Sequence, residues 1–135
     1  LRRPGADERR SLLAAVAGPA APGFGMRDSL NTTIGVVATS ARLDKAETSK
    51  MASVAHDGMA RAVRPAHSMT DGDTVFGLAT GAQALPSVTR HAALNLVLAA
   101  SADTFAAACT HAVLTATTIG PLLAYRDLCP SLYRC

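Results

Sequence analysis

The order of the predicted elements in this 135-residue chain indicates an α/β fold. Two runs rich in β-branched and apolar residues, Thr32–Thr39 and Thr74–Thr80, have the composition of strands. A stretch with helical periodicity follows each of them, the first from Asp44 to Val63 and the second from Ser87 to about Thr118. Two strands and two helices make half a domain, so we expect further strands to complete the sheet.

The segment before the first strand differs in composition from the rest of the chain. Residues 1–31 contain a charged start and a Pro/Gly-rich stretch from Gly18 to Gly25, which is typical of a linker. Only Ser11–Ala17 is expected to form a short helix there. The chain starts with Leu1, which leads us to expect a processed chain or a piece of a longer one.

Local signals define the elements that follow. The first strand does not alternate apolar and polar residues, so we expect both of its faces to be buried. Asp44 with Glu47 predicts a capping box at the start of the first helix, and Pro65 predicts its end near Val63.

The second half of the chain has weaker boundary signals. Gly81–Pro86 is expected to be a loop, and Ser87 is a candidate N-cap for the long helical region. Ser101–Asp103 could interrupt that region, and Gly120 with Pro121 would end it.

Composition excludes several classes of protein. With 49% hydrophobic and 17% charged residues, the chain is too apolar to be disordered. Aromatic residues make up 4% and the net charge of +3 is not gathered in one stripe, so we expect no nucleic-acid partner. Polar residues interrupt Ala92–Thr118, and we therefore expect no membrane partner.

The cysteines and histidines do not suggest a metal or another cofactor. Three cysteines without a CxxC pair predict free thiols in a reducing compartment, and hence a cytoplasmic protein. No histidine has metal-ligand spacing to another His or Cys. His67 is of interest because it precedes an acidic turn, whereas packing or surface roles are expected of the others, His56, His91 and His111.

Asn31-Thr32-Thr33, at the mouth of the first strand, is the first candidate for chemistry. Cleavage of the bond before a threonine frees an α-amino group beside Oγ, and this amine can act as the base because its pKa lies near 7.7–8.0. From the residues alone, the alternative is that these residues simply open a strand.

Asp71-Gly72-Asp73, directly before the second strand, is the second candidate. Two carboxylates at this spacing could orient a hydroxyl and an ammonium group. The alternative is an ordinary Asp-Gly turn. No further acidic cluster stands nearby, so a hard metal ion is not indicated.

Three motifs together are more specific than any of these signals: NTT before an apolar strand, AHDGMARAVRP, and DGDTVFGLATG. The stretch Leu30–Gly81 that holds them resembles the second half of the L-aminopeptidase/D-esterase family. That family includes the β-peptidyl aminopeptidases and the 6-aminohexanoate-oligomer (nylon oligomer) endohydrolase. YRDLCPS near the end of the chain extends the resemblance.

The resemblance implies a self-processing N-terminal-nucleophile hydrolase of amide bonds with a four-layer α/β/β/α sandwich fold. The Asn31–Thr32 bond would be the autocleavage site, and Thr32 would be the nucleophile. Asp71 and Asp73 match the positions that hold and polarise the nucleophile. Two acids at these positions are more similar to the nylon-oligomer hydrolase branch than to branches that carry Ser or Glu.

The resemblance also implies that much of the protein precedes Thr32. Residues 1–31 would be a linker and the end of an α-subunit-like segment, and residues 32–135 the β-subunit-like segment. The family's oxyanion Asn and its Lys near the nucleophile have no match in residues 1–31. The implied partners are a peptide or small amide substrate, an α-subunit-like segment and further copies in a homo-oligomer.

Two other functions stay open at this point. The chain could be a catalytically inactive remnant that serves as an interaction or assembly module. It could also be an acyltransferase similar to the ornithine acetyltransferases, which cut before a Thr on the same fold, although the second and third motifs match the aminopeptidases better.

Overall fold

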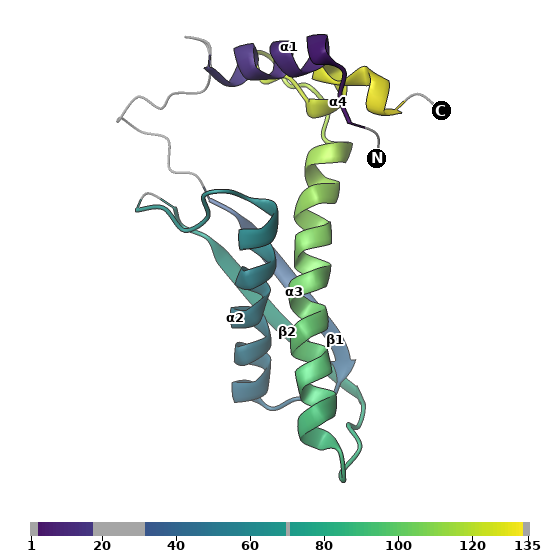
Figure 1. The fold of residues 1–135 in the computed structure, drawn as a ribbon. Helices are drawn as coiled ribbons and strands as arrows, with labels where there is room; N and C mark the ends of the chain where they lie inside the picture. Colours follow the sequence, from purple (N-terminus) through teal and green to yellow (C-terminus); the bar gives the residue numbers. More distant parts are fainter. Residues whose placement is uncertain (1–2, 18–31, 70, 134–135) are drawn as a thin grey trace. The chain divides into compact units, whose positions relative to one another are not determined.

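The computed structural model describes residues 3–17, 32–69 and 71–133 of the chain. These fall into two compact units, residues 30–110 and residues 1–29 with 111–135, and each is treated by itself below. Figure 1 shows the elements in chain order, and their bounds are α1 Ala6–Ala17, β1 Ile34–Ala41, α2 Lys45–Ala62, β2 Thr74–Gln83, α3 Arg90–Thr115, α4 Tyr125–Leu128 and a 3₁₀ turn Pro130–Tyr133.

The unit of residues 30–110 contains a two-stranded parallel sheet. β1 and β2 pair in register, with Ile34 opposite Thr74 and Ala38 opposite Leu78, up to an irregularity between Thr39 and Ala41. The helix α2 connects the two strands, as a parallel pair requires. The predicted α/β class and its strand, helix, strand, helix order are confirmed.

The first helix forms where its local signals predicted. Asp44 caps α2: its side chain accepts the Glu47 N–H at 2.8 Å, and the Glu47 side chain accepts the Asp44 N–H at 3.0 Å. This reciprocal pair satisfies two amides that the first turn of a helix otherwise leaves unpaired. α2 ends at Ala62, three residues before Pro65, as predicted.

One face of the sheet packs against both long helices. Gly77 lies on Thr48 of α2, and Gly35 lies beneath the ring of Phe105 on α3, so a larger residue at either glycine would overlap its neighbour. Figure 1 shows α2 and α3 running alongside the strands. The buried core of this unit consists of Val37, Met51, Ala55, Met59, Val75 and Phe105.

α3 runs without a break through the expected interruption at Ser101–Asp103. The Ser101 hydroxyl donates within its own helix to the Leu98 carbonyl at 2.7 Å and lies 3.2 Å from the Met51 carbonyl of α2. Its polar group is therefore satisfied inside the helix packing and does not cap a new helix. By length and composition alone, α3 would also be long and apolar enough to cross a membrane.

The other face of the sheet corrects an expectation. Both faces of the first strand were expected to be buried, but Ile34 and Val36 are 72% and 62% exposed, and Phe76 and Leu78 beside them are 57% and 54% exposed. These side chains occupy the alternate positions of β1 and β2, which point away from the helices. The same apolar run would appear in the sequence of a strand covered on both faces, so the run alone did not predict that one face is exposed.

The second unit contains a longer N-terminal helix than expected. α1 begins at Ala6 instead of Ser11, since acidic Asp7 and Glu8 in its first turn favour a helix start there. The Glu8 carboxylate accepts the Ser131 N–H at 2.8 Å, which ties α1 to the C-terminal turn. Tyr133 donates its hydroxyl proton to the Leu114 carbonyl at 2.8 Å.

The close contact between α2 and α3 yields a first prediction. A methyl group at Gly58 would overlap the backbone carbonyl of Ala102, which no side-chain rotation can relieve. Gly58→Ala should therefore lower the free energy of unfolding by about 3 kcal/mol, near the top of the range for overpacking. Urea unfolding followed by circular dichroism measures this, with Ser53→Ala on the exposed side of the same helix as the control, expected to change stability by less than about 0.5 kcal/mol. Equal stability of the two variants would contradict the packing described.

Candidate functional site

The candidate site lies where β1 and β2 begin side by side. Because the two strands are parallel, their first residues lie at the same edge of the sheet. Thr33 uses both of its backbone groups there: its N–H donates to Oδ1 of Asp73 at 2.8 Å, and its carbonyl accepts the Thr74 N–H at 2.9 Å. Thr32 is exposed at the mouth of the strand. Asn31, the other half of the expected cleavage site, lies outside the described residues.

Gly72 brings the acidic turn close to Thr32. A methyl group built on Gly72 would lie 3.1 Å from the Thr32 hydroxyl oxygen, closer than ordinary van der Waals contact. The backbone of the turn therefore lies closer to the hydroxyl than a residue with a Cβ would allow without a small shift of the Thr32 side chain. The sequence had placed Thr32 and the Asp71-Gly72-Asp73 turn at neighbouring strand starts, and the structure brings them together.

The two acidic residues make different contacts. Asp73 reaches across to β1, and its side chain is 7% exposed. Asp71 instead contacts its own loop: its carboxylate accepts the Ser68 N–H at 2.7 Å, and its N–H donates to the Ser68 carbonyl at 3.2 Å. Asp71 thus contacts the loop that precedes it, while Asp73 contacts the segment with the threonines.

Two histidines stand behind Asp73. Nδ1 of His67 lies 3.1 Å from Oδ2 of Asp73, and Nε2 of the same ring lies 3.3 Å from Nδ1 of His56 on α2. The sequence had singled out His67 for its place before the turn. It had assigned His56 a packing or surface role, because a partner eleven positions away across a helix end leaves no local pattern.

Hydrogen bonding keeps Asp73 ionised. The N–H of Thr33 is the main cause that lowers the pKa of the Asp73 carboxyl; burial opposes it, and the Thr33 side chain and the nearby His67 lower the pKa further. On α3, burial raises the pKa of the Cys109 thiol, and the charge of Asp73 adds to this effect. At neutral pH, the Asp73 carboxyl is therefore ionised and the Cys109 thiol is neutral.

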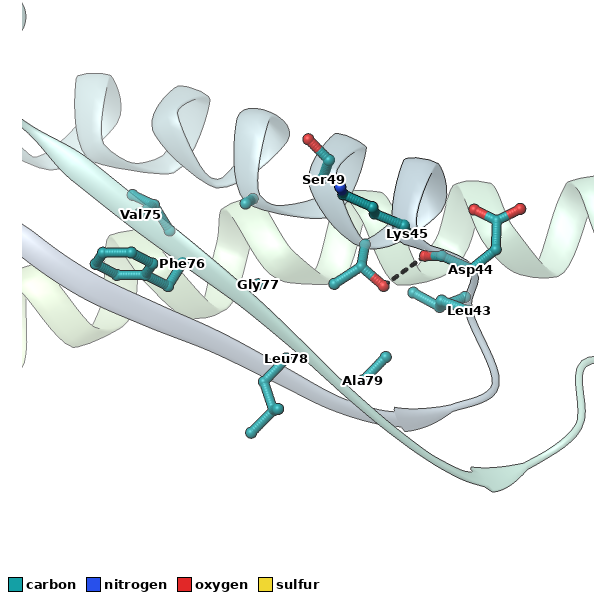
Figure 2. A pocket seen from close by; sticks show the side chains of 11 residues that line it. Leu43, Asp44, Lys45, Ser49, Val75, Phe76, Gly77, Leu78 and Ala79 are labelled. Atoms are coloured by element: carbon teal, nitrogen blue, oxygen red, sulfur yellow. Dashed lines mark hydrogen bonds between the residues drawn. The ribbon is translucent and has the colours of Figure 1, made fainter.

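A shallow depression of about 410 Å³ runs along β2 beside the start of α2. Figure 2 shows it from close by, with Val75 on the helix side of the strand and Leu78 on the opposite side. Neither Thr32 nor Asp73 lines it. Among the described residues, no group of three or more His, Cys, Asp or Glu side chains could hold a metal ion.

The lowered pKa of Asp73 predicts how stability depends on pH. A carboxyl whose pKa is lower in the folded chain stabilises it fully above the unfolded value of about 3.9, and this contribution is lost as the pH falls through the folded value. The free energy of unfolding should therefore drop more steeply below pH 4 in the parent chain than in Asp73→Asn. Urea titrations between pH 3 and pH 6 test this, with the exposed Asp57→Asn as the control. Parallel curves for the parent and Asp73→Asn would contradict the assignment.

Comparison with known proteins places these residues in a wider context. The sequence profile of Peptidase family S58 matches residues 5–122. An uncharacterized aminopeptidase of Mycobacterium tuberculosis is 40% identical over an alignment that covers 98% of this chain and 40% of the relative. An uncharacterized aminopeptidase of Mycobacterium leprae is 42% identical over 78% of this chain and 31% of its own length.

A shorter match points to a second group of relatives. The 6-aminohexanoate-oligomer endohydrolase of Paenarthrobacter ureafaciens is 37% identical over 57 residues, which are 42% of this chain and 16% of that enzyme. The chain thus spans at most about 40% of the length of these relatives. Since the family profile covers most of the 135 residues, the chain belongs to Peptidase family S58.

Proposed function

We propose that the chain is the nucleophile-bearing part of a self-processing hydrolase that cleaves amide bonds. The observation that carries the proposal is the hydrogen bond from Thr33 N–H to Asp73, with Gly72 beside the Thr32 hydroxyl. An exposed threonine at a strand start, whose next residue is bound by an ionised carboxylate, has features that suit a hydroxyl nucleophile. The printed names of the relatives, aminopeptidase and oligomer endohydrolase, support amide chemistry.

The proposed processing step uses only groups of this chain and water. Oγ of Thr32 attacks the carbonyl carbon of Asn31, the C–N bond to Thr32 breaks, and the Thr32 nitrogen leaves as the free α-amine. Water then hydrolyses the Asn31 ester to a carboxylate and restores the hydroxyl. In later turnovers the amine takes the proton from Oγ as the hydroxyl attacks the substrate amide.

Asp73 and Asp71 would have separate roles in this reaction. Asp73 holds the backbone after the nucleophile through Thr33, and its charge can stabilise the ammonium form that appears when the amine takes up a proton. Asp71 keeps the turn in place through Ser68, so that Gly72 stays against Thr32. We assign a catalytic role to Thr32, a positioning role to Asp73, and support of the loop to Asp71.

The proposal includes partners beyond this chain. We infer that residues 1–31 end an α-subunit-like segment and that residues 32–135 form the β-subunit-like segment, in a chain that is a piece of a longer protein. The exposed apolar side chains of Ile34, Val36, Phe76 and Leu78 support a second sheet packed on this face, as in a four-layer sandwich. Substrates would be peptides or short aliphatic amide oligomers, and the assembled enzyme a homo-oligomer.

Self-cleavage is tested by intact mass. Where the chain processes, two fragments that meet between Asn31 and Thr32 should appear, and N-terminal sequencing of the larger one should begin with Thr32. Thr32→Ala should abolish the cut because it removes the attacking oxygen, whereas Thr32→Ser should retain it. The exposed Thr104→Ala on α3 serves as the control. Cleavage that persists in Thr32→Ala, or that begins the larger fragment at Thr33, would remove Thr32 from its role.

If the chain alone stays intact, the longer protein should be used for the same measurement. Adding the preceding segment of the 40%-identical mycobacterial relative supplies the residues that this chain does not span. An uncut product with that segment present would contradict self-processing.

The contact at Gly72 gives a separate prediction. The methyl group of Gly72→Ala would push the Thr32 hydroxyl by a few tenths of an ångström, because the side chain can rotate away. Misplacement of a nucleophile by this amount should slow processing about tenfold, while stability changes by less than about 1 kcal/mol. Cleavage time courses and thermal unfolding measure the two effects. Gly5→Ala, where an added methyl group has only a loose contact, is the control. Unchanged kinetics in Gly72→Ala would place the reactive group elsewhere.

A further inference from the structure

Three side chains from separate parts of the fold form a hydrogen-bonded row behind the candidate nucleophile. Asp73 stands before β2, His67 in the loop after α2, and His56 within α2. The contacts are 3.1 Å from Asp73 Oδ2 to His67 Nδ1 and 3.3 Å from His67 Nε2 to His56 Nδ1, and the two ring centroids are 4.9 Å apart. The exposed fraction rises from 7% at Asp73 to 45% at His67, so the row leads from a buried carboxylate toward solvent.

The chemistry of the row restricts where its protons can be. An ionised carboxylate only accepts hydrogen bonds, so Nδ1 of His67 carries a hydrogen. Nε2 of His67 is then either bare and accepts from His56 Nδ1–H, or protonated and donates to a bare His56 Nδ1. Two hydrogens cannot face each other at this distance. Asp73 keeps its donor in both arrangements.

The backbone at His67 supports a specific role for the ring. His67 has φ of 59°, in the left-handed region that residues other than glycine seldom adopt. Glycine would adopt this conformation at a lower energetic cost, so a histidine here carries backbone strain that a glycine would avoid. The conformation directs the ring at Asp73.

We propose that His67, backed by His56, is a positioning residue: it holds the Asp73 carboxylate in the orientation that binds Thr33 N–H. This inference rests on the proposed function of Thr32, because the position of Thr33 matters for catalysis only if its neighbour is the nucleophile. Among the described residues, Asp73 is the charged group in contact with His67, and its charge also raises the pKa of the Cys109 thiol on α3.

Nuclear magnetic resonance on the labelled 135-residue chain tests the contact without any need for activity. Imidazole nitrogen shifts should show neutral His67 as the Nδ1–H tautomer. In His67→Gly, which suits the backbone but lacks the ring, the Asp73 carboxyl should titrate at higher pH. Exchange of the Thr33 amide should become about tenfold faster, as expected for the weakening of a charge-assisted hydrogen bond.

Two further variants separate positioning from general packing. His67→Asn retains an N–H donor and tolerates a left-handed backbone, so it should restore most of the Thr33 amide protection. His56→Gln should leave the exchange of the Thr33 amide within about twofold of the parent chain. His91→Gln, exposed at the start of α3, is the matched control and should change none of these quantities.

Specific outcomes would overturn the inference. They are an Nε2–H tautomer for His67, or an unchanged exchange rate of the Thr33 amide in a folded His67→Gly. If His67→Gly does not fold, the tautomer in the parent chain and the rescue in His67→Asn decide. A chain that shows the expected tautomer and amide protection, yet whose longer form never cuts before Thr32, would retain the His67 contact and refute the proposed function instead.

Discussion

The hydrogen bond from the Thr33 amide to the Asp73 carboxylate is the contact on which the rest of the site depends. It joins residues forty positions apart, and it can form only because β1 and β2 are neighbouring parallel strands whose first residues meet at one edge. The same bond keeps the carboxylate charged, since it lowers the pKa of Asp73 against the effect of burial. One hydrogen bond therefore determines both where the Asp73 carboxylate lies and that it is ionised.

The helix that connects the two strands helps to fix how the first residues of the strands meet. α2 spans the sheet and is bounded at both ends, by the capping box at Asp44 and by Pro65 beyond its last turn. At its start, Glu47 also binds Arg90 of α3 through contacts of 2.6 Å. Gly58 lets α3 come close to α2, and this packing orders the helix layer against which the sheet rests. Positions that look unrelated in sequence thus determine how Thr33 meets Asp73.

Local signals in the sequence predicted the parts of the fold that local physics controls. A capping box and a proline act within a few residues, and so the bounds of α2 agreed with expectation. Neighbouring strand starts predicted that Thr32 and the acidic turn come together. The sequence predicted one long helical region and left a break at Ser101 open; the break is absent because the hydroxyl is satisfied by the Leu98 carbonyl and by contact with α2. The contact of His56 with His67 was not predicted, because the two residues meet only when the loop after α2 folds back toward the helix.

The exposed apolar face of the sheet affects how this unit behaves in solution. On the two strands, the exposed apolar side chains form one surface, which consists of Ile34, Val36, Phe76 and Leu78. Among the described residues, β2 pairs only with β1, so its other edge has no strand partner. Surfaces of this kind recruit other strands, including those of identical molecules. Molecules of this unit in concentrated solution are therefore expected to associate through their exposed sheet faces.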